Sequence, residues 1–125
     1  MDKATRLDAL LPGGRGVWIP IDHGASDYPT EGLRDLEATI TSLVKAGVNA
    51  IVAQKGVVSK YSHLCEGTNT SMVVHYSVST RHGGPDSDNK VIVGHADETV
   101  SIGGYWVFSQ PDLGSNLGSS MMRGW

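Results

Sequence analysis

Two short apolar runs without polar alternation do most to limit the folds open to this chain. The first covers residues 17–21 and the second residues 48–53, and the polar side chains that follow each run at once predict a loop there. A strand that is buried on both faces has this pattern, because each of its side chains packs against apolar neighbours. Strands of that kind occur mainly in parallel sheets, so the runs predict an α/β fold.

A helical pattern connects the two runs. Apolar residues recur at intervals of three and four between Thr30, which is suited to cap a helix, and Gly47, which is suited to end one. They are Leu33, Leu36, Ile40, Leu43 and Val44. Strand, helix and strand in this order make one βαβ unit with parallel strands.

The rest of the chain repeats the strand pattern more weakly. Residues 72–78 predict a third strand, residues 96–102 a short helix before two glycines, and residues 105–109 a fourth strand. Residues 81–89 have the glycine, proline and aspartate content of a surface loop. We therefore expect one domain, residues 1–125, with about four parallel strands in (β/α) units.

Composition limits the kinds of partner. The chain is 39% hydrophobic with a formal charge of −3, and its basic residues are scattered, so neither a nucleic-acid partner nor a membrane partner is indicated. No apolar run approaches the roughly 20 residues of a membrane span, and the first residues do not resemble a secretory signal, which favours the cytoplasm. A small-molecule substrate or another protein chain is the expected partner. The single cysteine, Cys65, is expected to be a buried or idle thiol.

Several familiar kinds of site are not indicated. The five histidines lack the i, i+4 helical spacing of a zinc site, and no thiolate cluster accompanies them. There is neither a Gly-x-Ser-x-Gly sequence nor a complete phosphate-binding loop. We therefore expect neither a metal nor a cofactor.

Polar side chains follow the predicted strands where each strand ends. The carboxyl ends of parallel strands meet at one edge of a sheet, so these side chains are expected to line one ligand mouth. The candidate catalytic residues are Asp22, Lys55 and His75, and the candidate substrate-binding residues are His23, Gly24, Ser77 and Gln110.

Asp22 and Lys55 each allow more than one interpretation. Asp22 follows a buried run, where partial burial is expected to raise its pKa and suit it to proton transfer; alternatively, its carboxylate accepts hydrogen bonds from loop amides. Lys55 is suited to bind a phosphate or carboxylate as a point charge, or to act as an amine if burial lowers its pKa. The alternative for Lys55 is a solvated surface side chain.

Five stretches, in the same order along the chain, resemble one enzyme family. They are residues 17–24 with 29–33, 46–52 with 55–58, 73–77, 90–93 and 112–115. They are similar to the first half of the archaeal-type class I fructose-bisphosphate aldolases and their relatives, the 2-amino-3,7-dideoxy-D-threo-hept-6-ulosonate synthases. The resemblance implies half of a TIM-type barrel and a lyase or transaldolase-like reaction on a phosphorylated ketose or ketose-like substrate.

In that family a lysine amine attacks the substrate carbonyl, and the iminium that forms accepts electrons as the carbon–carbon bond changes. By motif position Asp22 resembles the family's first-strand aspartate, which assists proton transfer, and His23, Lys55 and His75 would line the same mouth. The family's Schiff-base lysine, its tyrosine acid/base and its phosphate-binding loops belong to later strands than those matched. Gln54 also stands where relatives carry histidine.

The fourth predicted strand departs further from the family. Trp106 and Phe108 stand where relatives have small residues, and Pro111 removes an amide donor just after the strand. Bulky residues at inward positions would overfill a closed barrel, whose interior is tightly packed.

Three accounts of function follow from these observations. In the first, the chain is a truncated aldolase relative that acts only with a complementary half-barrel. In the second it is a non-catalytic binding or structural module that self-associates as a homo-oligomer, because an open half-barrel exposes strand edges. In the third, Lys55 supplies the amine of a re-purposed enzyme, with Asp22 as its proton-transfer partner.

Overall fold

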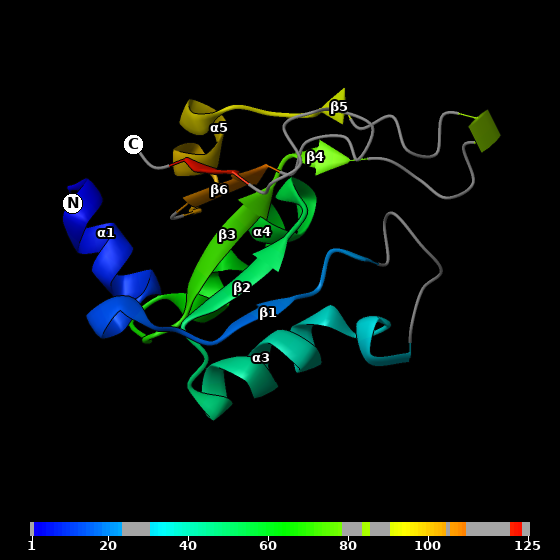
Figure 1. Ribbon diagram of the computed structural model, residues 1–125. Helices are drawn as coiled ribbons and strands as arrows, with labels where there is room; N and C mark the ends of the chain where they lie inside the picture. The colour runs from blue at the N-terminus through cyan, green and yellow to red at the C-terminus, as the bar shows by residue number, and fades with distance from the viewer. Residues whose placement is uncertain are drawn as a thin grey trace.

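The computed structural model (Figure 1) describes part of the chain. The described residues are 2–23, 31–78, 84–85, 91–104, 106–109 and 121–123, the last two ranges by their backbone only. Within them, a sheet is built from strands that are far apart in the sequence, and helices connect its first strands. No helix in these ranges is long and apolar enough to cross a membrane.

Four strands of the sheet run parallel and lie side by side in chain order. They are β1 (Trp18–Pro20), β2 (Ala50–Ala53), β3 (Ser71–His75) and β6 (Trp106–Ser109). A short strand, β7 (Met121–Arg123), pairs antiparallel with the far edge of β6. Successive (β/α) units produce parallel strands in this order, so the predicted α/β class is confirmed.

Helices precede the first strand and occupy the connections between the strands. The helices are α1 (Lys3–Leu10), α3 (Leu36–Ala46), α4 (Lys55–Tyr61) and α5 (Ala96–Ser101). Short 3₁₀ helices are η1 (Pro12–Gly14), η2 (Glu31–Leu33) and η3 (Ser62–Cys65). α3 connects β1 to β2, α4 and η3 connect β2 to β3, and α5 precedes β6.

The boundaries of α3 follow from its two caps. The Asp35 carboxylate accepts a hydrogen bond from the Ala38 amide at 3.0 Å, so the helix begins at Leu36. At the other end Gly47 has φ +82°, and its amide donates to carbonyls of the last turn. The predicted end at Gly47 is confirmed. The predicted start at Thr30 is wrong, because the capping aspartate lies further along the chain.

Two other local predictions also need correction. The polar segment expected to form a loop after the second strand is instead the start of α4, whose seven residues are too few to show helical periodicity in the sequence. The third predicted strand is divided after His75, and β4 (Ser77–Val78) pairs antiparallel with β5 (Val91–Ile92). That pairing depends on residues distant in sequence.

The two faces of the sheet are covered differently. One, which we call the helix face, packs against α3, α4 and η3. Its buried residues are Ile21, Ile40, Val48, Ile51, Ala53, Val58, Cys65, Met72, Val74 and Tyr76. The opposite face, which we call the α1 face, has a smaller cluster made of Leu10, Ala50, Val52 and Val73. Burial of Cys65 agrees with the expected buried thiol, and burial raises the pKa of that thiol.

The end of α1 closes one end of the α1 face. Leu10, the last residue of α1, is fully buried, and the Trp18 indole Nε1 donates a hydrogen bond to its carbonyl at 2.9 Å. Trp18 begins β1, so this contact lies at the N-terminal ends of the strands, where α1 is seen in Figure 1. The C-terminal ends of the strands lie at the other edge of the sheet.

Candidate active site

A carboxylate and an imidazole meet at the C-terminal edge of the sheet. His75 is the last residue of β3, and Asp22 follows β1 by two positions. The Asp22 Oδ2 atom and the His75 Nδ1 atom are joined by a short hydrogen bond. Because β2 lies between β1 and β3, the two side chains converge over the end of the intervening strand.

This pair is on the α1 face of the sheet. Side chains alternate between faces along a strand, so His75 shares a face with Val73, which belongs to the cluster around Leu10. The neighbours Val74 and Tyr76 point to the helix face. The side chains of Asp22 and His75 retain only 15% and 11% of their exposure, which makes the pair a largely desolvated ionisable site.

Burial and the imidazole act in opposite directions on Asp22. Burial by itself would raise the pKa of Asp22, as the sequence suggested. The hydrogen bond from His75 and its positive charge when protonated outweigh that effect, so the pKa of Asp22 lies below its ordinary value of 3.8. The expectation of a raised pKa is therefore wrong. Asp22 is an ionised carboxylate at neutral pH, held by a histidine that lies 53 residues further along the chain.

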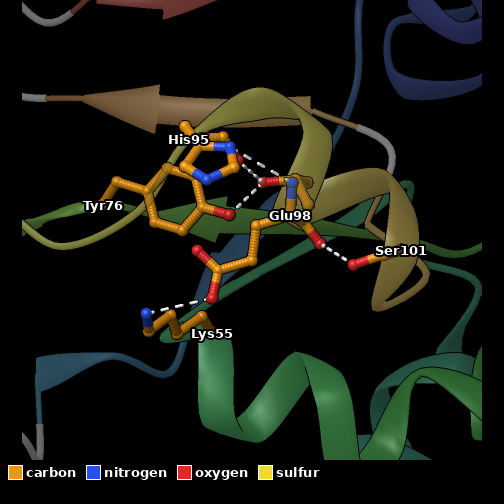
Figure 2. A network of polar contacts seen from close by, with 6 residues as sticks. Lys55, Tyr76, His95, Glu98 and Ser101 are labelled. Atoms are coloured by element: carbon orange, nitrogen blue, oxygen red, sulfur yellow. Dashed lines mark hydrogen bonds and ion pairs between the residues drawn. The ribbon is translucent and has the colours of Figure 1, made fainter.

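Lys55 has a different partner. It is the first residue of α4, directly beyond the end of β2, and its Nζ atom lies 3.0 Å from Glu98 Oε1 in α5 (Figure 2). The two side chains retain 42% and 32% of their exposure. The structure therefore brings Asp22 and His75 together and pairs Lys55 separately with Glu98.

Further polar contacts on the helix face surround this ion pair (Figure 2). The hydroxyls of Tyr76 and Thr99 are joined by a short hydrogen bond, and both residues are buried. The His95 Nδ1 atom accepts the Glu98 amide hydrogen bond at 3.5 Å, which caps α5. Burial, more than any other influence, raises the pKa of Tyr76, and the Glu98 charge adds to it.

Sequence reasoning did not find Glu98, Tyr76 or Thr99. Glu98 lies 43 residues from Lys55, and an acidic residue in the first turn of a helix is common for reasons unrelated to function. The only available signal was a pair of opposite charges on elements that follow neighbouring strands.

The remaining candidates lie in different surroundings. His23 is exposed next to Asp22, and its charge is among the influences that lower the pKa of Asp22. Ser77 is buried in β4. Gly24 and Gln110 lie outside the described residues. Across the described ranges, no three histidine, cysteine, aspartate or glutamate side chains converge as metal ligands would.

Comparison with known proteins identifies relatives with this chain's sequence pattern. The family model for the DeoC/LacD family aldolases matches residues 17–107. The 2-amino-3,7-dideoxy-D-threo-hept-6-ulosonate synthase of Halobacterium salinarum is 32% identical over 114 residues, which are 91% of this chain and 42% of that enzyme. Synthase 1 of the same name from Archaeoglobus fulgidus is 27% identical over 115 residues, 92% of this chain and 43% of that enzyme.

A third relative has a different name. The 2-amino-4,5-dihydroxy-6-oxo-7-(phosphonooxy)heptanoate synthase of Streptomyces griseus is 32% identical over 99 residues, 78% of this chain and 35% of that enzyme. The chain thus spans about two fifths of the length of these curated relatives. The predicted resemblance is confirmed, and these matches do not support a non-catalytic module.

Proposed function

Because this chain belongs to the DeoC/LacD aldolase family, we propose that it contributes the Asp22–His75 pair to an enzyme that makes or breaks a carbon–carbon bond by an aldol reaction. The observation that supports this function is the convergence of these two side chains at the C-terminal edge of a parallel sheet. Enzymes with parallel α/β folds place their reacting groups at that edge.

The proposed chemistry is proton transfer at the substrate's hydroxyl. In aldol cleavage this hydroxyl loses its proton while the adjacent carbon–carbon bond breaks and its electrons move toward the former ketone carbon. The Asp22 carboxylate stabilises the imidazolium that forms when a histidine takes a proton, so the pair accepts the proton better than either group alone. In bond formation the same proton returns to the new hydroxyl oxygen.

The proposed substrate class is a ketone that carries a phosphate ester. The name of the Streptomyces griseus relative describes a compound with a ketone next to a phosphonooxy-bearing carbon and two hydroxyls on its other side. A hydroxyl on the second carbon from a ketone is the pattern that an aldol reaction makes. Dihydroxyacetone phosphate is the ketone fragment that such a compound releases, so it is our probe for this chain.

The amine of a Schiff-base mechanism is not assigned to Lys55. Its ion pair with Glu98 is made by the charged ammonium, whereas attack on a carbonyl needs the free amine. The family resemblance places the amine on a later strand. We propose that β1, β2, β3 and β6 are the first strands of the barrel to which that strand belongs, as their chain order and the family suggest.

Complementation tests this function. The full chain is mixed with the part of the Halobacterium salinarum synthase that it does not match, and release of dihydroxyacetone phosphate from fructose 1,6-bisphosphate is followed. We expect activity that neither protein shows alone, and a kcat lowered roughly 10²–10⁴-fold by Asp22→Asn, the usual effect of losing a general acid or base. Asp35→Asn is the matched control, since asparagine caps a helix as well as aspartate.

Two results would contradict the proposal. An Asp22→Asn mixture that turns over as fast as the unmodified mixture would show that the pair has no chemical role. A mixture without activity, although the two parts co-elute as a complex, would show that this chain does not supply an aldolase site.

A further inference from the structure

Tyr76 is adjacent to His75 in the chain but lies on the opposite face of the sheet. His75 turns toward Asp22 on the α1 face, while the Tyr76 ring packs in the core of the helix face with 1% of its surface exposed. Consecutive residues share one peptide unit. Contacts that fix Tyr76 therefore also restrict the position of the His75 backbone, from which the imidazole side chain extends.

Three contacts fix Tyr76 to the segment around α5. Its hydroxyl is hydrogen-bonded to Thr99, and its carbonyl accepts the Val93 amide hydrogen bond at 2.9 Å. Gly94 lies directly against the ring: a Cβ added there would come within 2.3 Å of the ring atom Cε1. Together these contacts hold the residue from its ring, its hydroxyl and its backbone.

The α5 helix is itself tied to the element that follows β2. Glu98, the neighbour of Thr99, forms the ion pair with Lys55 at the start of α4 (Figure 2). The Thr99 hydroxyl oxygen also lies 3.3 Å from the His95 carbonyl oxygen, within the first turn of α5. The hydroxyl that holds Tyr76 is thus part of a helix that His95 caps and that Glu98 ties to α4.

We propose that Tyr76 is a positioning residue, which holds His75 in hydrogen-bonding contact with Asp22 through the Tyr76–Thr99 hydrogen bond. The proposed function supplies the chemical role of the Asp22–His75 pair, and the positioning itself needs only the geometry described above. Support for a residue at the substrate edge thus comes through the sheet from the helix face.

The test follows the Asp22–His75 hydrogen bond directly by NMR of the full chain with labelled histidine. The His75 ring proton shared with Asp22 exchanges with water only when the contact opens. Thr99→Val keeps the side-chain shape but removes the hydroxyl. We expect it to accelerate this exchange roughly two- to tenfold, the factor that corresponds to the net strength of one hydrogen bond. Tyr76→Phe should have a similar effect. Thr99→Ser keeps the hydroxyl, so exchange in this variant should be as slow as in the unmodified chain.

Ser101→Ala is the matched control. Ser101 is another hydroxyl residue of α5, but within the described part of the chain its Oγ donates only to the Glu98 carbonyl, at 2.7 Å, so its loss tests general loosening of the helix. Exchange in Thr99→Val no faster than in Ser101→Ala, or no recovery in Thr99→Ser, would overturn the proposal. The exchange measurement needs no substrate, so its result tests the role of Tyr76 independently of the proposed aldolase activity.

Discussion

Two polar pairs lie near the C-terminal edge of the same sheet, and their surroundings differ. Asp22 and His75 are mostly buried on the α1 face, where the apolar cluster is small. Lys55 and Glu98 are partly exposed on the helix face and join two helices. Ionisable groups cost free energy to bury, so a buried pair at this edge supports the proposed chemical role, whereas a solvent-exposed pair is more often structural.

The Lys55–Glu98 pair on the helix face bears on the Asp22–His75 site because it ties down α5, which contacts Tyr76. α5 holds Tyr76, and Tyr76 is joined by one peptide bond to His75. We therefore propose separate roles for the two faces at this edge of the sheet. In this proposal one face presents the reacting groups, and the other provides the packing that fixes them.

The largest effect on stability is expected where Gly94, two residues before α5, packs against Tyr76. Gly94→Ala would place a Cβ 2.3 Å and 2.6 Å from two carbons of a buried ring, so we expect a loss of about 1–3 kcal/mol in the free energy of unfolding, typical of overpacking. Gly32→Ala is the control, because nothing lies within 4 Å of its added Cβ. Urea denaturation of both variants measures the difference, and equal midpoints would show that the contact is loose.

A smaller effect should appear as a pH dependence of stability. The folded-state pKa of Asp22 lies below 3.8, so its ionisation stabilises the fold above that pH and the contribution is lost as pH falls through the folded value. Between about pH 5 and about pH 3, the unmodified chain should lose more stability than Asp22→Asn. Urea denaturation across this range is the measurement. Parallel curves would mean that His75 does not favour the ionised carboxylate.

Removing the exposed pair should change stability still less. We expect Lys55→Met to lower the free energy of unfolding by less than about 1 kcal/mol, because a partly exposed ion pair is screened by water and salt. Lys45→Met, at an exposed lysine in the last turn of α3, is the control. Added salt should reduce the difference between the two variants. If Lys55→Met lowered the free energy of unfolding by several kcal/mol, the pair would contribute far more than a partly exposed ion pair can.

The smallest expected signal is a covalent one. With dihydroxyacetone phosphate or fructose 1,6-bisphosphate and borohydride, the isolated chain should form little or no reducible adduct, because Lys55 is engaged as an ammonium by Glu98. Mass spectrometry detects any adduct. A stoichiometric adduct that Lys55→Met abolishes and Lys60→Met retains would make Lys55 the nucleophile of a re-purposed enzyme.

Local patterns in the sequence predicted much of the fold. Apolar runs indicated β1, β2 and, more weakly, β3; Asp22 lies just beyond the end of β1 and His75 is the last residue of β3. The direction of the Asp22 pKa shift was missed because burial is visible locally whereas the imidazole partner is not. For the same reason Glu98 was missed as the partner of Lys55. Contacts between distant residues decide the electrostatics, and apolar periodicity does not reveal them.

We propose that the substrate binds at the Asp22–His75 pair and not at the Lys55–Glu98 pair. The most direct test is NMR titration of the full chain with dihydroxyacetone phosphate, following the backbone amides of both regions. We predict the largest shifts at Asp22 and His75, with Asp22→Asn removing them and Glu98→Gln leaving them in place. Shifts centred on Lys55 and Glu98, unchanged by Asp22→Asn, would contradict the account.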